Sequence, residues 1–205
     1  MNDSEFKFYK NLAKLNRGTT RQIGYGSLSS QWVRFEVLFK AIQDICGTIP
    51  SRILDFGCGR GDLLKYLHSK SCDVARIKYI GIDAIEENIA DAKTAWPNNR
   101  FDLFNYDGAS ELPNTDIAMF SGCFSTTPLE DIKKIYTRLI EAADIGVVGN
   151  FLLKNPSMSY EEGCLPRNLE ELMTLIPVAT HTFTIIGNYL PHDVTIAIQR
   201  RQGRK

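Results

Sequence analysis

The sequence predicts an α/β protein with a doubly wound, mostly parallel sheet of seven strands, preceded by a helical N-terminal segment. Three observations predict this fold class. After residue 50, strand and helix patterns alternate, which is typical of a parallel sheet with helices on both faces. The first strand enters a helix through a turn that contains Gly57, Gly59 and Gly61. Only residues 188–192 separate the last two strand patterns, which is too short for a parallel crossover, so the last strand is expected to run antiparallel.

Residues 1–50 are predicted to be helical and to form an extension that covers the sheet domain as a lid. The apolar residues of the first helix recur at helical spacing: Phe6, Phe8, Tyr9, Leu12 and Leu15. A polar break with glycines at positions 18, 24 and 26 follows. A second helix is expected to start near Ser29 or Ser30, either of which can cap it, and to end at Gly47.

Residues 51–205 are predicted to form one domain, because no linker divides them. The predicted strands are Arg52–Phe56, Tyr79–Asp83, Arg100–Asn105, Asp116–Ser121, Ile145–Leu153, Thr180–Gly187 and Val194–Arg200. The predicted helices between them are Gly61–Ser69, Glu86–Trp96, Leu129–Ala143 and Leu169–Ile176.

The composition excludes several classes of protein. The 205 residues carry 24 Lys and Arg against 24 Asp and Glu, and this balance opposes bulk electrostatic binding to nucleic acid or to an anionic membrane. No apolar run approaches the roughly 20 residues that span a bilayer, and the N-terminus lacks a signal-peptide pattern. Five scattered cysteines without a C-x-x-C pair support neither a disulfide framework nor a metal site. We therefore expect a cytoplasmic protein with reduced thiols.

Two acidic residues accompany the glycine turn. A pyrophosphate-binding loop has the spacing G-x-G-x-x-G, whereas this turn has G-x-G-x-G, with Asp55 two residues before the first glycine. A carboxylate at that position suits a cationic ligand such as an α-ammonium group. Asp83, at the end of the next predicted strand, can accept hydrogen bonds from both hydroxyls of a ribose.

These segments resemble the class I S-adenosylmethionine (SAM)-dependent methyltransferases. The resemblance rests on residues 54–62, 81–84 and 105–108, followed by Glu111-Leu112-Pro113, and extends from about residue 50 to the C-terminus. It implies a Rossmann-like fold with an antiparallel last strand, S-adenosyl-L-methionine as the cofactor and transferase activity. Residues 24–35 are also similar to a segment in a group of small bacterial methyltransferases.

The resemblance implies a role for each matching residue. Gly57, Cys58 and Gly59 would line the methionyl part of the cofactor, with Asp55 beneath it. Asp83 would bind the ribose. Beside the adenine would lie Ala84, Ile85, Asp107 and Gly108, and near the transferable methyl group Ser121 or Gly122.

Arg34 has two interpretations. It can form a bidentate pair with the carboxylate of the cofactor, or it is a solvated surface arginine.

The methyl acceptor is expected at the carboxyl edge of the sheet, where segments 121–126, 154–166 and 188–192 meet. The candidate pocket residues are Tyr9, Tyr25, Cys123, Phe124, Tyr160, Glu161, Glu162, Tyr189 and His192. His192 is either a general base toward a hydroxyl or amine or a polar surface residue. Tyr25 and Tyr160 complete the catalytic candidates.

We expect in-line methyl transfer to the oxygen or nitrogen of a small molecule. The fourth predicted strand is followed by Ser121-Gly122-Cys123-Phe124 instead of the signature of amino-methylating nucleic-acid enzymes, which disfavours a nucleic-acid acceptor. Three alternatives stay open. They are a non-catalytic subunit that binds a partner protein, an NAD-dependent oxidoreductase, which the glycine spacing and Asp55 oppose, and cofactor use without methyl transfer.

Overall fold

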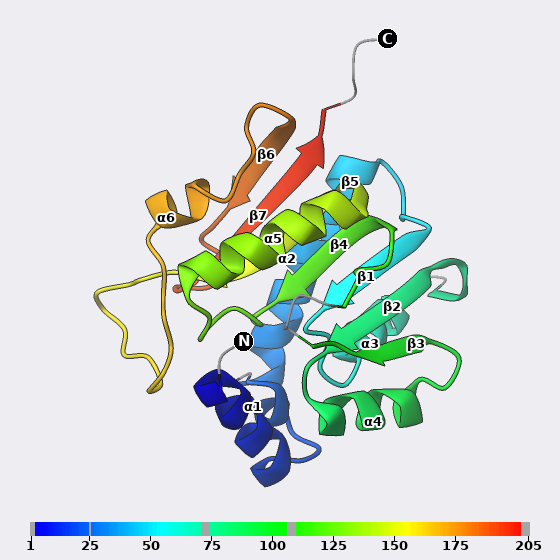
Figure 1. Cartoon of the computed structure of the whole chain (residues 1–205), viewed down its shortest axis with the longest axis vertical. Helices are drawn as coiled ribbons and strands as arrows, with labels where there is room; N and C mark the ends of the chain where they lie inside the picture. The colour runs from blue at the N-terminus through cyan, green and yellow to red at the C-terminus, as the bar shows by residue number, and fades with distance from the viewer. Residues whose placement is uncertain (1–2, 25, 71–73, 106–109, 202–205) are drawn as a thin grey trace.

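The described part of the chain contains helices on both faces of one sheet (Figure 1). The structure, a computed structural model, describes residues 3–24, 26–70, 74–105 and 110–201. The strands are β1 (Arg52–Phe56), β2 (Lys78–Asp83), β3 (Arg100–Leu103), β4 (Thr115–Ser121), β5 (Ala143–Leu152), β6 (His181–Ile186) and β7 (Asp193–Arg200). The helices are α1 (Asp3–Leu15), η1 (Thr20–Ile23), α2 (Leu28–Cys46), α3 (Asp62–Ser69), η2 (Val74–Arg76), α4 (Glu86–Ala95), α5 (Leu129–Ala142) and α6 (Leu169–Met173).

The seven strands lie in the order β3-β2-β1-β4-β5-β7-β6. Strands β3, β2, β1, β4 and β5 pair in parallel. Strand β7 pairs antiparallel with both β5 and β6. The short connection at residues 188–192 is therefore a hairpin, and the predicted fold class, with its antiparallel last strand, is confirmed.

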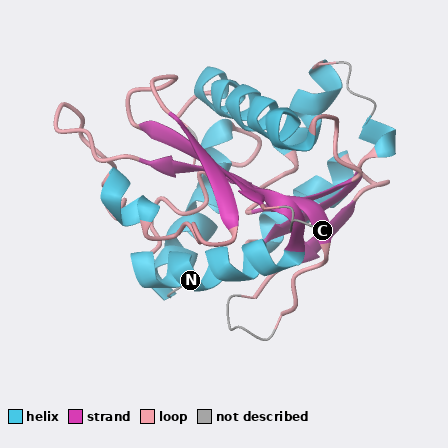
Figure 2. Cartoon of the chain, turned by 90° about the horizontal axis from the view of Figure 1, so that it is seen from above, coloured by secondary structure: helices cyan, strands magenta, loops and turns pink. Residues whose placement is uncertain are grey.

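Figure 2 shows the helices on both faces of the sheet from above. Two apolar clusters hold them there. Leu54 and Phe56 of β1 point into the cluster shared with α5 and α6. Their neighbour Ile53 points into the other cluster, which α2, α3 and α4 complete. This alternation follows from the two-residue period of a strand.

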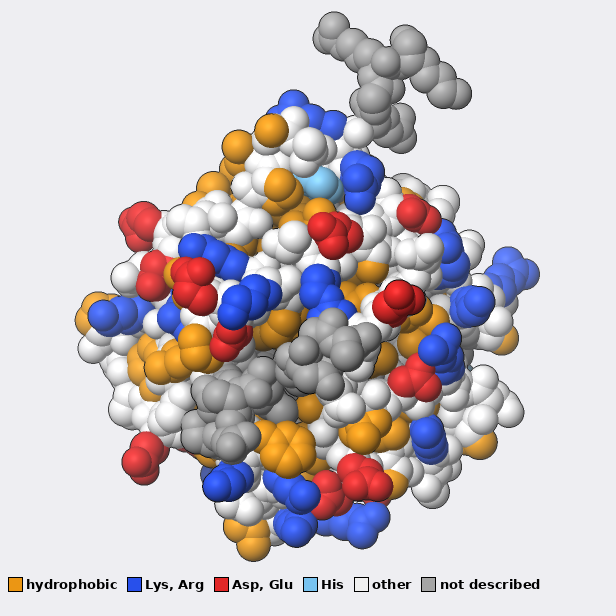
Figure 3. Space-filling view, viewed as in Figure 1, with side chains coloured by type: hydrophobic (Ala, Val, Ile, Leu, Met, Phe, Trp, Pro, Cys, Tyr) orange, Lys and Arg blue, Asp and Glu red, His pale blue; other side chains and the backbone are white. Residues whose placement is uncertain are grey.

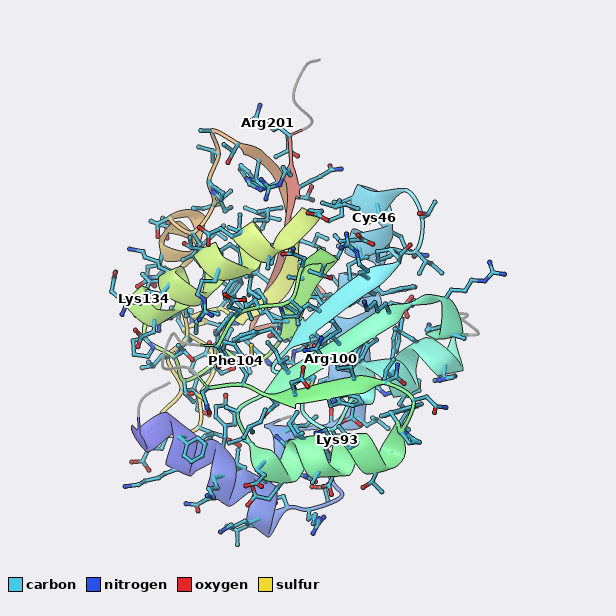
Figure 4. All side chains as sticks on the ribbon, turned by 45° about the vertical axis from the view of Figure 1, so that its right-hand side comes forward. Cys46, Lys93, Arg100, Phe104, Lys134 and Arg201 are labelled. Atoms are coloured by element: carbon cyan, nitrogen blue, oxygen red, sulfur yellow. The ribbon has the colours of Figure 1, made fainter. Side chains whose placement is uncertain are left out.

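Helix α2 runs opposite to the parallel strands and brings its N-terminus to their carboxyl edge. Its last turn lies near the start of the sheet, where Gln199 Nε2 donates to the Ile45 carbonyl oxygen at 2.8 Å and where Figure 4 labels Cys46. The N-cap is Ser27, whose hydroxyl accepts from the Ser30 amide at 3.1 Å. The prediction of a cap at Ser29 or Ser30 was therefore wrong, because the chain is already helical from Leu28 onward.

Some local features differ from the predictions. The polar break after α1 contains the 3₁₀ helix η1, and helix α6 ends at Met173 rather than at Ile176. Charged side chains of both signs are interspersed over the face that Figure 3 shows, in agreement with the zero net charge of the sequence. None of the helices in the described ranges combines the length and the apolarity needed to cross a bilayer.

Candidate functional site

A cavity lies at the carboxyl edge of the sheet, where β1, β2 and β4 end. This first cavity has an empty volume of about 660 Å³, which includes its open mouth. The structure brings together here eight of the residues predicted to bind a cofactor: Asp55, Gly57, Cys58, Gly59, Asp83, Ala84, Ile85 and Ser121. The rest of the lining is Tyr9, Ile23, Gln31, Phe35, Asp62, Asn88, Gly122 and Cys123.

The glycine turn requires glycine at two positions of the cavity wall. Gly57 and Gly59 have φ values of 73° and 55°, a region that other residues rarely adopt. A Cβ atom on Gly57 would lie 2.5 Å from Cys123 Cβ, and one on Gly59 would lie 2.8 Å from Ile23 Cγ2. The bare backbone therefore allows both the loop after β4 and the N-terminal segment to approach the turn.

The two predicted acids occupy different surroundings in the cavity. Asp55 is 4% exposed, and its Oδ2 accepts from the Tyr79 hydroxyl at 2.6 Å. Asp83 accepts through Oδ2 from the Gly59 amide at 2.9 Å and through Oδ1 from the Ile85 amide at 2.8 Å. These backbone donors hold the Asp83 carboxylate at the strand end, facing the cavity.

Burial raises the pKa of both carboxyl groups. The pKa of Asp55 is raised to about 7: desolvation is the main cause, the Tyr79 hydrogen bond opposes it, and the charges of Asp83 and Asp62 add to the rise. Desolvation also raises the pKa of Asp83, although backbone amides oppose this shift. A cation in the cavity would therefore stabilise the ionised form of both carboxyl groups.

Gln31 and Asp62 add two acceptors to the same cavity. Gln31 is fully buried on α2, and its Nε2 lies 3.4 Å from Asp62 Oδ2. Its Oε1 is buried without a hydrogen-bond partner in the described structure. Buried polar atoms are almost always hydrogen-bonded, so an orphaned acceptor on a cavity wall indicates a ligand that donates.

The lining of the first cavity is negatively charged. Asp55, Asp62 and Asp83 line it, and no Lys, Arg or His is present among the described lining residues. Arg60 pairs with Asp62 at 3.3 Å from outside the lining. The cavity thus favours a ligand with ammonium or sulfonium groups over one with a pyrophosphate.

The N-terminal segment closes over the first cavity and is fastened to α4. Gln22 of η1 is buried, and its Nε2 donates to Asn88 Oδ1 at 3.2 Å and to Asp91 Oδ2 at 2.9 Å. Arg17 pairs with Asp91 at 2.7 Å. Asn88 Nδ2 in turn lies 3.5 Å from Asp83 Oδ1, which links the segment to the strand-end acid.

A second cavity of about 950 Å³, including its open mouth, adjoins the first and shares Tyr9, Ile23 and Gly122 with it. Its other lining residues are Phe8, Gly24, Gly26, Arg34, Ser125, Thr126, Asn150, Leu152, Met158, Ser159, Tyr160, Glu161, Cys164, His192 and Asp193. The lining includes the rings of Phe8, Tyr9 and Tyr160. It also includes four linked polar side chains, which we call the floor of the cavity: Arg34, Asn150, His192 and Asp193. The second cavity lies where the sequence predicts the acceptor pocket.

Arg34 lies on the floor of the second cavity and not in the first. It is 8% exposed, so the interpretation as a solvated surface arginine is wrong. Its Nε donates to Asp193 Oδ2 at 2.6 Å, and its Nη2 lies 3.3 Å from His192 Nε2. The guanidinium is thus already paired within the protein, which argues against the predicted role toward a cofactor carboxylate.

Of the three catalytic candidates, His192 and Tyr160 line the second cavity, and Tyr25 does not belong to the described structure. Tyr25 lies outside the described residues, as do Asp107 and Gly108 from the cofactor prediction. Tyr160 lines the second cavity, but its hydroxyl donates to the Leu153 carbonyl oxygen at 2.7 Å and accepts from the Asn155 amide at 2.6 Å. Because the hydroxyl already donates to one backbone group and accepts from another, we assign Tyr160 to holding the loop after β5 in place and not to proton transfer.

The structure places the other predicted pocket residues in different surroundings. Cys123 lines the first cavity, and desolvation raises the pKa of its thiol, as expected for a packing residue. Phe124 belongs to the apolar core, where its ring centroid lies 4.8 Å from that of Phe120. The Tyr189 hydroxyl is paired with Thr195 Oγ1 at 2.8 Å. Tyr189 and Glu162 are absent from the described linings of both cavities.

Some lining residues were missed by sequence reasoning. Asp62 follows the last glycine of the turn, so its position at a helix start could have indicated it. Gln31 carries a weaker signal as a polar residue on the apolar side of α2. Ile23 meets the site only through contacts distant in sequence, and no local pattern indicates it. Asn88 follows Asp83 by five residues, and its Nδ2 lies 3.5 Å from Asp83 Oδ1.

Solved structures share this architecture over almost the whole chain. Magnesium protoporphyrin IX methyltransferase (ChlM) from Synechocystis PCC 6803, with bound SAM, has a TM-score of 0.70 at 13% identity, covering 98% of this chain and 99% of its own. DhpI in complex with S-adenosylhomocysteine (SAH) has a TM-score of 0.70 at 15% identity, covering 97% and 96%. The plantazolicin methyltransferase BpumL, in complex with a pentazolic desmethylPZN analog and SAH, has a TM-score of 0.65 at 16% identity, covering 97% and 98%.

The chain has the class I methyltransferase fold. The low identities limit this likeness to the fold, and residue roles depend on the cavities described above. No protein-family model and no curated protein matches the sequence.

Proposed function

We propose that the protein is a SAM-dependent methyltransferase with a small-molecule acceptor. The observation that carries this proposal is the acidic first cavity, which adjoins a second, mostly uncharged cavity at the end of β4. The first cavity suits a cofactor that carries an ammonium and a sulfonium group, and the second suits an acceptor beside the reactive end of that cofactor. The neighbouring folds, solved with SAM or SAH, support the same assignment.

The described residues fit each part of the cofactor. Asp62, Asp55 and the orphaned Gln31 Oε1 would receive the α-ammonium group. Asp83 would accept the ribose hydroxyls, since its backbone donors already aim the carboxylate at the cavity. Ala84 and Ile85 would lie beside the adenine, as the resemblance implies, and the roles of Asp107 and Gly108 stay predictions.

When bound, SAM would supply an activated methyl group for an acceptor lone pair, the C–S electron pair would stay on sulfur, and any proton on the acceptor atom would be lost to bulk solvent when the product leaves. The protein positions this reaction at the wall formed by Ser121 and Gly122. Asn150 fixes that wall, because its Oδ1 accepts from the Ser121 hydroxyl at 3.1 Å and from the Gly122 amide at 2.9 Å. Alignment of this kind is the main catalytic contribution when the methyl is already activated.

Helix α2, which belongs to the predicted extension of residues 1–50, packs into the core of the sheet domain instead of covering it. We propose that the segment before α2 acts as a lid on the methyltransferase domain, whose sheet is formed by residues 51–205. Tyr9 and Ile23 cover the first cavity, and the contacts of Gln22 and Arg17 with α4 hold them there. Such a lid excludes water from the reacting atoms. A cytoplasmic location is part of the proposal and rests on the free cysteines of the described chain: Cys46, Cys58, Cys123 and Cys164.

The competing functions predict different ligands. An NAD-dependent oxidoreductase would have to place a pyrophosphate beside Asp55 and Asp62, which like-charge repulsion opposes. A non-catalytic subunit would bind the cofactor or a partner protein without turnover.

Thermal unfolding with SAM, SAH and NAD separates these functions. At a hundredfold excess over its dissociation constant, SAH should stabilise the protein by about 2.7 kcal/mol, and NAD should not. Release of SAH from SAM in the presence of a metabolite extract then distinguishes an enzyme from a binding subunit. Stabilisation by NAD without stabilisation by SAH would overturn the assignment.

A further inference from the structure

We propose that His192 is a hydrogen-bond donor that anchors an uncharged carbonyl oxygen of the methyl acceptor, instead of the general base that the sequence suggests. This inference rests on the function proposed above and adds the class of acceptor to it. Three observations carry it: the partner of each ring nitrogen of His192, the fixed position of the ring, and the charges on the floor of the second cavity.

The ring nitrogens of His192 have distinguishable partners. Nε2 lies 3.3 Å from Arg34 Nη2. A guanidinium group only donates hydrogen bonds, so Nε2 must offer its lone pair to Arg34. In a neutral imidazole the proton is then on Nδ1. A proton on both nitrogens would turn an N–H group and a positive charge toward Arg34. His192 therefore has no free lone pair with which to take a proton from an acceptor.

Among the described residues, the Nδ1–H group has only a weak partner. It lies 3.2 Å from the thioether sulfur of Met158, which belongs to the loop between β5 and α6. Sulfur in a thioether is a weak hydrogen-bond acceptor. Both residues line the second cavity. An oxygen atom of a ligand would replace Met158 as a stronger partner for this donor.

The position of His192 is fixed by its neighbours. Its carbonyl oxygen accepts from the Leu153 amide at 2.7 Å at the end of the hairpin. The Arg34 side chain is held by Asp193, which is 3% exposed. Asp193 Oδ1 lies 3.5 Å from Asn150 Nδ2, and Asn150 also holds the Gly122 amide. One polar network thus connects the donor to the wall at which the methyl group is proposed to lie.

The charges of the floor favour a neutral partner. The Arg34 and Asp193 charges compensate each other at 2.6 Å. Glu161 adds a further negative charge to the described lining. A carboxylate on the acceptor would meet this excess, whereas the oxygen of an amide, ester or ketone would not. The acceptor class is therefore a compound with a carbonyl group close to its methylated atom.

The tautomer of His192 can be measured without any acceptor. Long-range ¹H–¹⁵N correlation spectra of the full chain at pH 8, with and without SAH, report which ring nitrogen carries the proton. The sequence has three histidines, and His192→Asn assigns the signals of interest. We expect Nδ1–H, and an Nε2–H tautomer would overturn the proposal. Failure of SAH to bind would instead count against the proposed function.

The acceptor class is tested with benzamide and benzoate as probes on the SAH-loaded protein. Benzamide should shift the His192 Nδ1 signal and bind more tightly than benzoate. His192→Asn keeps a donor at the Nδ1 position and should keep benzamide affinity, whereas His192→Gln and His192→Ala should lose about fivefold. Tighter binding of benzoate would make the acceptor a carboxylate. Equal benzamide affinity in all variants would remove His192 from recognition.

Discussion

Replacing Asp55 by asparagine should stabilise the cofactor-free protein at neutral and alkaline pH. The Asp55 carboxyl group is buried, and desolvation raises its pKa from 3.8 to about 7. Each pH unit between these two values is worth about 1.4 kcal/mol, so ionised Asp55 costs the folded state at most about 4 kcal/mol at pH 8. The amide oxygen of asparagine can still accept from the Tyr79 hydroxyl, so the variant removes the charge and keeps the hydrogen bond.

The sign of the effect follows from proton binding. Between pH 3.8 and about 7, folded Asp55 holds a proton that the unfolded chain has released. The free energy of unfolding of the wild type therefore falls as the pH rises through this window. Asp55→Asn lacks this loss, so the two proteins should be similarly stable at pH 4, and the difference should reach its maximum above pH 7.

Urea unfolding at pH 4, 6 and 8 measures this difference. Asp44→Asn is the matched control, because it removes the same charge from an exposed position on α2. The control should show no gap that grows with pH. The same Asp55→Asn variant should bind SAM at least tenfold more weakly, because it lacks the charge that meets the cation. A variant less stable than the wild type at pH 8, or with undiminished SAM affinity, would refute the reasoning.

Three further predictions concern the strand-end acid, the lid and the core. Asp83→Ala should weaken SAH binding in calorimetry by about 1.5–3 kcal/mol for each charge-assisted hydrogen bond lost, and unchanged affinity in a folded variant would remove Asp83 from the site. Deleting residues 1–28 should leave a folded domain by circular dichroism that has little or no turnover; full activity would contradict the lid. Gly149→Ala should lower the free energy of unfolding by roughly 1–3 kcal/mol, because its Cβ would lie 2.0 Å from Phe120 Cζ. SAH affinity per folded molecule should stay unchanged in Gly149→Ala, and stability equal to the wild type would contradict the packing argument.

The sheet could be predicted from the sequence because its signals are local. Most strands are short, largely apolar runs, and β1 begins and ends at the predicted residues, Arg52 and Phe56. The antiparallel last strand followed from the five residues of the hairpin alone. The acidic residues at the edge of the sheet could also be predicted, because Asp55 and Asp83 occupy characteristic sequence positions relative to the glycine turn.

The floor of the second cavity could not be predicted, because its contacts join distant parts of the chain. Arg34 and Asp193 are 159 residues apart, and neither position carries a local sign of the other. The partner of His192 Nε2 decides whether the ring is a base or a donor, and that partner is set by how α2 packs on the start of β7. The same holds for Gln22 and Asn88, which are 66 residues apart.

The wall that the two cavities share has a kinetic consequence. Tyr9 and Ile23 belong to both linings, so the segment that must open to admit the cofactor also completes the acceptor site. The substrates should then add in a compulsory order, with SAM before the acceptor, and the methylated product should leave before SAH. In such a sequence SAH competes with SAM for the free enzyme and does not compete with the acceptor. Removal of SAH by other enzymes would therefore increase the fraction of this protein that is free to bind SAM.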